Sequence, residues 1–216
     1  MERIETKITI ADYNISLILN KPRVFKECLI IANGAGGNMH SPFILKFHKL
    51  IADQGIMTVK FNFHYQEIGK KFPDSNKKCQ ETYLGVINYL DSEHVNIKNI
   101  VPGGKSMGGR IATQIAGQIE SPKLIVFGYP LHPPGKPGQL RDQHLYELDK
   151  KILIFQGEND SFGNRNEITP VINKLKDARI VFISNADHSL KTPKKSLMTE
   201  QQVNEIILKE VKDFLD

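Results

Sequence analysis

A serine between glycines near the middle of the chain is the first feature with the residue types of a reactive site. It is Ser106, in the stretch VPGGKSMGGR (101–110). Read from Gly104 to Gly108, this stretch fits G-x-S-x-G, a sharp turn between a strand and a helix that exposes a nucleophilic serine. The residues GGKS (103–106) also fit the end of a phosphate-binding loop, whose pattern is G-x-x-x-x-G-K-[ST]. The first interpretation predicts a hydrolase and the second a nucleotide-binding protein.

The residues around Ser106 favour the nucleophile turn. A phosphate loop would need its first glycine at position 99, which is Asn99, and the residues before Lys105 look like a strand rather than a long loop. Later apolar runs do not end in an aspartate suited to hold magnesium. Glycines at 104 and 108 remove side chains that would clash at the turn. The following helix would point free N–H groups at the serine, where negative charge develops.

A serine nucleophile of this kind needs an acid and then a histidine later in the chain. Asp160 follows the apolar run KILIFQG (151–157), and His188 follows RIVFISN (179–185). Because active residues of open α/β sheets gather beyond the carboxyl ends of the strands, we expect both to reach Ser106. Asp160 would orient His188, which would accept the serine proton. Other acids and bases are placed less well relative to their strands: Glu158, Asp187, His132 and His144.

A glycine-rich loop, NGAGGNMH (33–40), follows the early apolar run CLIIA (28–32). Loops at this position supply one backbone donor of an oxyanion hole, and glycines let the backbone approach a ligand closely. We therefore assign the oxyanion donors to the N–H groups of Ala35 and Met107. The same loop and three further segments are expected to form the substrate pocket, through Met39, His64, Tyr65, Tyr129, His132 and Phe162.

The elements that must position these residues alternate along the chain. Residues 4–10 and 13–19 alternate apolar with polar side chains, which predicts an antiparallel hairpin at a sheet edge. Continuous apolar runs, typical of strands buried on both faces, follow at 28–32, 57–63, 99–104, 124–129, 151–157 and 179–185. Helical patterns separate them: after Ser41-Pro42, over 79–90 and 111–119, after Thr169-Pro170, and after a capping box of Thr199 and Gln202.

This order predicts an α/β fold with a mostly parallel sheet of about eight strands, an N-terminal antiparallel hairpin and helices on both faces. The stretch between Gly128 and Lys151 is too short for a helical cap domain, so we expect an open site. The 216 residues form a single domain, 1–216, and are 40% hydrophobic, enough for a sizeable core.

Composition argues against several classes of function. The net charge is +5 and the pI near 9.1, but the lysines are scattered, so we expect no nucleic-acid partner. Cys28 and Cys79 form neither a disulfide framework nor a metal cluster, and we expect buried free thiols in a reducing cytoplasm. The N-terminus lacks a signal-peptide pattern, and no apolar run reaches membrane-spanning length. No cofactor, metal or membrane partner is predicted.

Four segments carry a resemblance to a known superfamily: NGAGGN, GGKSMGGR, GENDSFG and ADHSL. In order and spacing they resemble the α/β-hydrolase superfamily across nearly the whole chain. Its smaller members include dienelactone hydrolases, carboxylesterases and acyl-protein thioesterases. FNFHYQEIGKKFPD (61–74) and GYPLHPPGKPGQLR (128–141) resemble a small branch that includes a testis-expressed protein and a subunit of the non-specific-lethal chromatin complex. This chain has His64 where that branch often has proline, and Asn33 in place of a usual histidine.

The resemblance implies a serine hydrolase of the α/β-hydrolase fold without a large cap, monomeric or homodimeric, acting on a small carboxylic ester or thioester. The alternative is a non-catalytic binding or scaffold protein with the same fold, for which the relative in the chromatin complex is a precedent. A third alternative is another acyl-transfer or lyase reaction at the same site.

Overall fold

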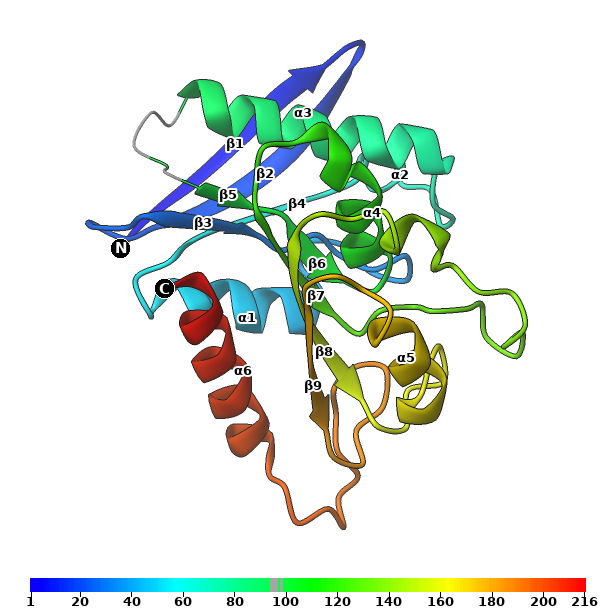
Figure 1. Cartoon of the computed structure of the whole chain (residues 1–216). Coiled ribbons are helices and arrows are strands. Elements are labelled where there is room, and N and C mark those ends of the chain that lie inside the picture. The colour runs from blue at the N-terminus through cyan, green and yellow to red at the C-terminus, as the bar shows by residue number, and fades with distance from the viewer. Residues whose placement is uncertain (94–96, 98) are drawn as a thin grey trace.

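The computed structural model describes residues 1–93, 97 and 99–216 (Figure 1). Strands in the described part of the chain are β1 (Glu2–Ile10), β2 (Tyr13–Lys21), β3 (Glu27–Ile30), β4 (Met57–Phe61), β5 (Asn99–Val101), β6 (Gly103–Lys105), β7 (Lys123–Phe127), β8 (Lys151–Gly157) and β9 (Ala178–Ile183). Helices are α1 (Pro42–Ala52), α2 (His64–Glu67), α3 (Asn76–Glu93), α4 (Met107–Ile115), α5 (Arg165–Ile172) and α6 (Glu200–Leu215), with 3-10 turns η1 (Ala116–Gln118) and η2 (Gln143–Leu145).

The strands form two hydrogen-bonded groups, in the order β1-β2-β4-β3-β5 and β6-β7-β8-β9. Strand β1 pairs antiparallel with β2, and β2 pairs antiparallel with β4. The other pairs are parallel. The predicted N-terminal hairpin is therefore present at the edge of a mixed sheet, and the continuous apolar runs form its parallel part.

The apolar run predicted as one strand over 99–104 is two segments, β5 and β6, because Pro102 lies between them. Proline has no N–H to donate to a strand ladder, although the Pro102 carbonyl still accepts a hydrogen bond from Ile125 N at 3.1 Å. A bridge between Ala32 and Gly104 joins the two groups of strands. This break accounts for the difference between the expected eight strands and the nine segments of the described residues.

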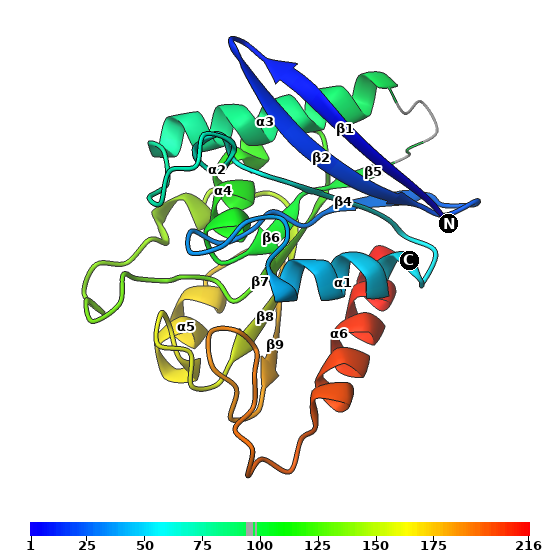
Figure 2. The same ribbon diagram turned by 180° about the vertical axis from the view of Figure 1, so that it is seen from behind.

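Helices cover both faces of the sheet (Figures 1 and 2). Helices α1 and α6 pack on one face, where Phe47 and Ile207 share a buried cluster with the stacked rings of Phe127 and Phe155. Helices α3 and α4 pack on the other face with β1 to β4, and α5 packs against β7 and β8. Burial of apolar area on both faces is the main stabilisation of such a layered fold.

Helix boundaries agree with the sequence in one case and differ in another. The capping box of Thr199 and Gln202 is confirmed at the start of α6. The helix expected after Thr169 begins earlier, because the Asn164 side chain accepts from the N–H groups of Asn166 and Glu167. Pro170 consequently lies inside α5 rather than at its start. The short α2 was not predicted.

Both cysteines are free and buried, as expected from their apolar surroundings. Burial raises the pKa of the Cys79 thiol to about 11, and it also raises the pKa of Cys28. Among the helices that the structure describes, none combines the length and the apolar character needed to cross a membrane.

Candidate active site

Ser106 lies on the turn between β6 and α4, with backbone angles φ 53° and ψ −117°. A positive φ is unfavourable for a residue with a side chain, so the surrounding backbone must hold this conformation. The glycines of the motif allow it: a Cβ on Gly108 would lie 2.5 Å from the Ala32 carbonyl oxygen, and one on Gly104 would lie at the same distance from that oxygen. The close approach presents the serine hydroxyl at the carboxyl edge of the sheet.

The three residues predicted to react together lie within hydrogen-bond distance of one another. His188 Nε2 lies 2.8 Å from Ser106 Oγ, and His188 Nδ1 lies 2.7 Å from Asp160 Oδ2. The carboxylate can only accept, so His188 carries its proton on Nδ1 and accepts the serine hydroxyl at Nε2. The imidazole is mostly buried and the carboxylate is fully buried. The arrangement matches that of a hydroxyl activated by a neighbouring base.

The Asp160 carboxylate is fixed by donors from its own loop and strand. Oδ1 accepts from Phe162 N at 2.8 Å, and Oδ2 accepts from Gln156 Nε2 at 2.9 Å in addition to His188. The Phe162 ring covers the imidazole, with ring centroids 4.2 Å apart. Gln156 and Phe162 thus limit the movement of both members of the acid–histidine pair.

The rival acids have other partners. Glu158 forms an ion pair with Arg165 at 2.7 Å and accepts from Asn185 N at 2.9 Å. Asp187 accepts the backbone N–H groups of Ser189 and Lys191 and so shapes the turn around His188. Both acids have structural contacts that keep them from orienting the imidazole.

The rival histidines lie elsewhere. His144 Nε2 lies 3.0 Å from Thr113 Oγ1, and burial lowers its pKa to about 4, with the charge of Arg110 adding to the effect. His132 is buried, with Nδ1 2.9 Å from the Pro133 carbonyl oxygen. Its Nε2 lies 3.5 Å from Glu167, within ion-pair range but without hydrogen-bond geometry.

Lys105 makes a contact to the His188 loop that sequence reasoning missed. Its side chain is buried, and Nζ donates to the backbone carbonyl oxygen of His188 at 2.5 Å. Burial lowers the pKa of Lys105 to about 8, although the charges of Asp160 and Asp187 act in the opposite direction. The sequence signal is a lysine inside an apolar strand run, directly before the serine. A buried amine there fixes the backbone that carries the imidazole.

The glycine-rich loop 33–40 passes close to the serine. A Cβ on Gly34 would lie 3.3 Å from Ser106 Cβ. The N–H of Met107 belongs to the first turn of α4, where the helix supplies no acceptor. Within the described part of the chain, we find no hydrogen bond from the Ala35 or Met107 N–H. Neither predicted oxyanion donor is thus engaged by an acceptor among the described residues.

Helix α2 supports this loop from behind. The Tyr65 hydroxyl donates to the Ala35 carbonyl oxygen at 3.2 Å, and Gln66 Nε2 donates to the Gly37 carbonyl oxygen. Asn33 closes the loop on itself by donating to the Gly34 carbonyl oxygen at 2.9 Å. The residue that replaces the usual histidine thus keeps a structural role in the loop.

A cavity of about 300 Å³ opens above Ser106. Ala35 and Met107 line it on the serine side, and Phe162 lines it beside the imidazole. Two cationic residues that were not predicted, Arg110 and Arg141, also line it. Arg110 lies four residues after Ser106, on the same face of α4, a spacing that could have been recognised from the sequence.

Of the six residues expected to form the pocket, the cavity lining includes Phe162 but not the other five. Tyr129 is buried behind the cavity wall, and its hydroxyl donates to the Arg141 carbonyl oxygen at 2.5 Å. His132 is also buried. The proline-rich segment therefore directs these two side chains into the core.

The other three lie around the glycine-rich loop. Tyr65 is buried beneath it, and Met39 is buried, with its carbonyl oxygen accepting from Lys60 Nζ at 3.0 Å. His64 Nδ1 lies 3.0 Å from Asp74 Oδ2, and Asp74 in turn lines the cavity. His64 consequently reaches the cavity only through Asp74.

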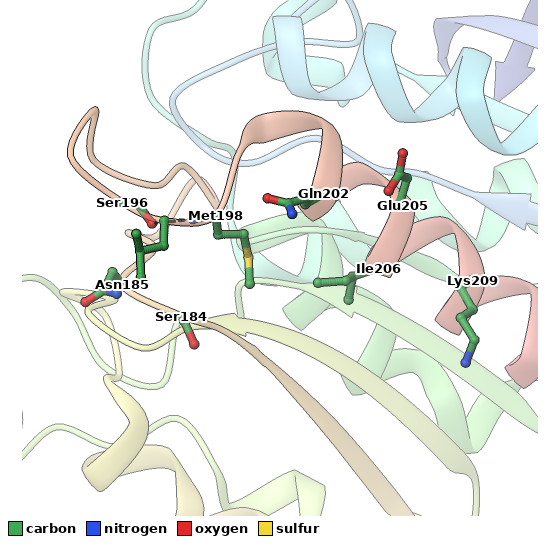
Figure 3. A pocket seen from close by; sticks show the side chains of 9 residues that line it. Ser184, Asn185, Ser196, Met198, Gln202, Glu205, Ile206 and Lys209 are labelled. Carbon is green, nitrogen blue, oxygen red and sulfur yellow. Dashed lines mark hydrogen bonds between the residues drawn. The ribbon is translucent and has the colours of Figure 1, made fainter.

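A larger cavity of about 550 Å³ lies between α6 and the segments around 184–185 and 196–198 (Figure 3). Its lining contains Met198, Ile206 and Lys209, but none of the three residues of the serine–histidine–aspartate chain. Outside residues 94–96 and 98, no group of three His, Cys, Asp or Glu side chains could hold a metal ion.

Comparisons with known proteins agree with the fold. The chain belongs to the α/β hydrolase domain family, whose model matches residues 25–216. This confirms the superfamily expected from the sequence.

Solved structures extend the likeness over the whole chain. An α/β serine hydrolase homologue from Coxiella burnetii superposes with a TM-score of 0.78 at 18% identity, covering 98% of both chains. Dienelactone hydrolase from Anabaena variabilis has a TM-score of 0.78 at 15% identity, covering 99% of this chain and 96% of its own. Est1E from Butyrivibrio proteoclasticus has a TM-score of 0.72 at 16% identity, covering 98% and 97%. Because these identities are between 15% and 18%, the likeness shows the fold alone.

Proposed function

We propose that the protein is a serine hydrolase that cleaves a small carboxylic ester or thioester through an acyl-enzyme. The observation that carries the proposal is the hydrogen-bonded chain from Asp160 through His188 to Ser106, with distances of 2.7 and 2.8 Å. Membership of the α/β hydrolase family and structural neighbours that include serine hydrolases and an esterase domain support the same class.

In the first half-reaction, Ser106 Oγ attacks the substrate carbonyl carbon while His188 Nε2 takes the hydroxyl proton. The carbonyl oxygen becomes an oxyanion, which the N–H groups of Ala35 and Met107 stabilise. The positive imidazolium is stabilised by the Asp160 carboxylate. Collapse of the tetrahedral intermediate breaks the bond to the alcohol or thiol, and His188 returns the proton to that leaving group.

In the second half-reaction, water enters the position of the leaving group. His188 takes one proton from the water as its oxygen attacks the acyl carbon, and Ser106 leaves with that proton. The products are the carboxylic acid and free enzyme. A cavity of about 300 Å³ is at the small end of ligand sites, which favours compact substrates.

An alkyl fluorophosphonate probe tests the proposal, because it reacts only with an activated serine. We expect stoichiometric labelling of Ser106 in the folded protein and none in the Ser106→Ala variant. A panel of p-nitrophenyl and thioesters of graded chain length then gives the acyl preference. Folded protein that resists the probe and is inert on the panel, while a control hydrolase reacts, would identify a non-catalytic member of the fold.

A further inference from the structure

Two guanidinium groups lie at the wall of the cavity above Ser106. Arg110 comes from α4, and Arg141 comes from the loop between β7 and β8. The arginine ion pairs found among the described residues use Arg3, Arg165 and Arg179. Neither cavity arginine has a carboxylate within ion-pair distance in that part of the chain.

The contacts of Arg110 leave part of its hydrogen-bonding capacity unused. Nη1 donates to Asn76 Oδ1 at 3.2 Å, while Nε is buried without a hydrogen-bond partner. Burial lowers the pKa of Arg110, and the charge of Arg141 lowers it further. A buried donor without an acceptor and two neighbouring like charges are both unfavourable. Such an arrangement is characteristic of a site that pairs with an anion from outside the chain.

The cavity contains one acidic side chain in the described lining, and that acid is already engaged. Asp74 Oδ2 lies 3.0 Å from His64 Nδ1. It forms no ion pair with Arg110 or Arg141, although all three line the same cavity. The lining therefore offers two uncompensated guanidinium groups to a ligand.

We propose that the natural substrate carries a carboxylate in addition to its scissile ester or thioester, and that Arg110 and Arg141 bind this carboxylate. This inference rests on the function proposed above. The planar guanidinium matches the two oxygens of a carboxylate. Arg110 follows Ser106 by four residues, about 6 Å of helix rise, and both residues line the same cavity, so one compact substrate can contact both. The small cavity agrees with a compact, bifunctional acid.

Two pairs of esters test the proposal, each comparing a carboxylate with the neutral amide of the same shape. Monoethyl fumarate and its amide place the group on the acyl side, and the trans double bond keeps it from attacking the ester itself. 4-Acetoxybenzoate and 4-acetoxybenzamide place it on the leaving-group side. We expect kcat/KM for the carboxylate to exceed that for the amide by about 10- to 100-fold in one pair. The pair that shows the preference identifies the side of the ester that faces the arginines.

Substitution of the arginines tests their role in this preference. In Arg110→Met and Arg141→Met, the carboxylate-to-amide ratio should fall about tenfold or more. Arg23→Met is the matched control, because Arg23 is exposed and far along the chain from the site, and it should keep the ratio of the unmodified protein. Equal turnover of acid and amide in both pairs, or a preference that survives both cavity substitutions, overturns the proposal.

Binding measured without turnover separates this inference from the proposed function. In Ser106→Ala, calorimetry should show tighter binding of monoethyl fumarate than of its amide, or of 4-hydroxybenzoate than of 4-hydroxybenzamide, and this difference should vanish in the arginine variants. Failure of probe labelling and ester cleavage contradicts the hydrolase. Labelling and cleavage without any preference for the acid, in turnover and in binding, leave the hydrolase standing and overturn the carboxylate site.

Discussion

The carboxylate of Asp160 accepts hydrogen bonds from Gln156, Phe162 and His188, and all three donors are held by the fold. Two of them come from the same strand end or loop as the acid. The carboxylate is therefore held by contacts other than the one with His188. Because this fixed carboxylate accepts from His188 Nδ1, Asp160 determines the tautomer of the imidazole.

Asp160→Asn should lower kcat by about 10⁴-fold, because an amide can donate to Nδ1 and stabilise the wrong tautomer of His188. Steady-state kinetics on an activated ester measures the loss, and urea denaturation checks that the variant folds. Glu158→Gln is the matched control, since Glu158 pairs with Arg165 and not with the imidazole. A loss of less than tenfold in Asp160→Asn would contradict the assigned role.

Lys105→Met should lower kcat by about 10- to 100-fold with a smaller change in KM. The substitution removes the donor to the His188 carbonyl oxygen, and small displacements of catalytic groups have effects of this size. Stopped-flow labelling by the fluorophosphonate should slow in parallel. Lys136→Met, on an exposed loop, serves as the control. Unchanged labelling in Lys105→Met would show that the His188 loop holds its position without the amine.

Residue-level prediction from the sequence succeeded in placing Ser106, Asp160 and His188 near one another, because strand ends have a fixed direction. Of the six predicted pocket residues it found only Phe162 in the cavity lining, because side-chain direction in the segments around Tyr129 and His64 depends on the path of irregular backbone. Arg110 was missed although its helical spacing from Ser106 was available. Arg141 has no local pattern that marks it.

At the scale of single elements, the close approach of α4 to the end of β3 determines the conformation of the sharp turn at Ser106. Gly108→Ala should destabilise the protein by about 1–3 kcal/mol, because its Cβ would lie 2.5 Å from the Ala32 carbonyl oxygen. The displacement of α4 that relieves this contact should also widen the proposed oxyanion site and reduce kcat. Gly117→Ala is the matched control, since its Cβ meets nothing within 4 Å. Urea denaturation and ester kinetics measure the two effects, and equal stability of both variants would refute the packing argument.

Elements with strong periodicity were predicted within a few residues, as in α1, α3 and α6. The start of α5 was wrong because Thr169-Pro170 resembles a helix start, whereas Asn164 with Glu167 three residues later forms the capping box. The break at Pro102 depends on strand pairing, because β5 pairs with β3 whereas β6 pairs with β7. Such pairings are non-local and carry no short-range signal.

On the scale of the whole molecule, His48 links stability to pH. Its ring is buried on α1 and neither ring nitrogen has a hydrogen-bond partner within the described residues. Burial lowers the pKa of His48 to about 3, and the charges of Lys60 and Arg3 lower it further. The unfolded chain, with a histidine pKa near 6.5, binds a proton that the folded state excludes.

The free energy of unfolding should therefore be largest above pH 6.5 and fall by about 1.4 kcal/mol per pH unit between pH 6.5 and 3 on account of His48. Urea denaturation at pH 7, 6 and 5 measures this slope. His48→Leu should reduce the slope, while His40→Leu, at an exposed position, should retain it. Parallel pH profiles for the two variants would mean that other groups dominate acid unfolding.

The break at Pro102 places the residues of the proposed active site on two groups of strands. Ser106, Asp160 and His188 follow β6, β8 and β9, whereas Ala35 follows β3 of the other group. The seam between them is closed by the Ala32–Gly104 bridge and by the hydrogen bond from Lys105 N to the Ala32 carbonyl oxygen at 2.8 Å. In the proposed reaction, the attacking oxygen of Ser106 and the oxyanion donor Ala35 thus follow strands of different groups. Weakening of the Ala32–Gly104 bridge would reduce the stabilisation of the proposed intermediate by Ala35, and it would leave the activation of Ser106 by His188 intact.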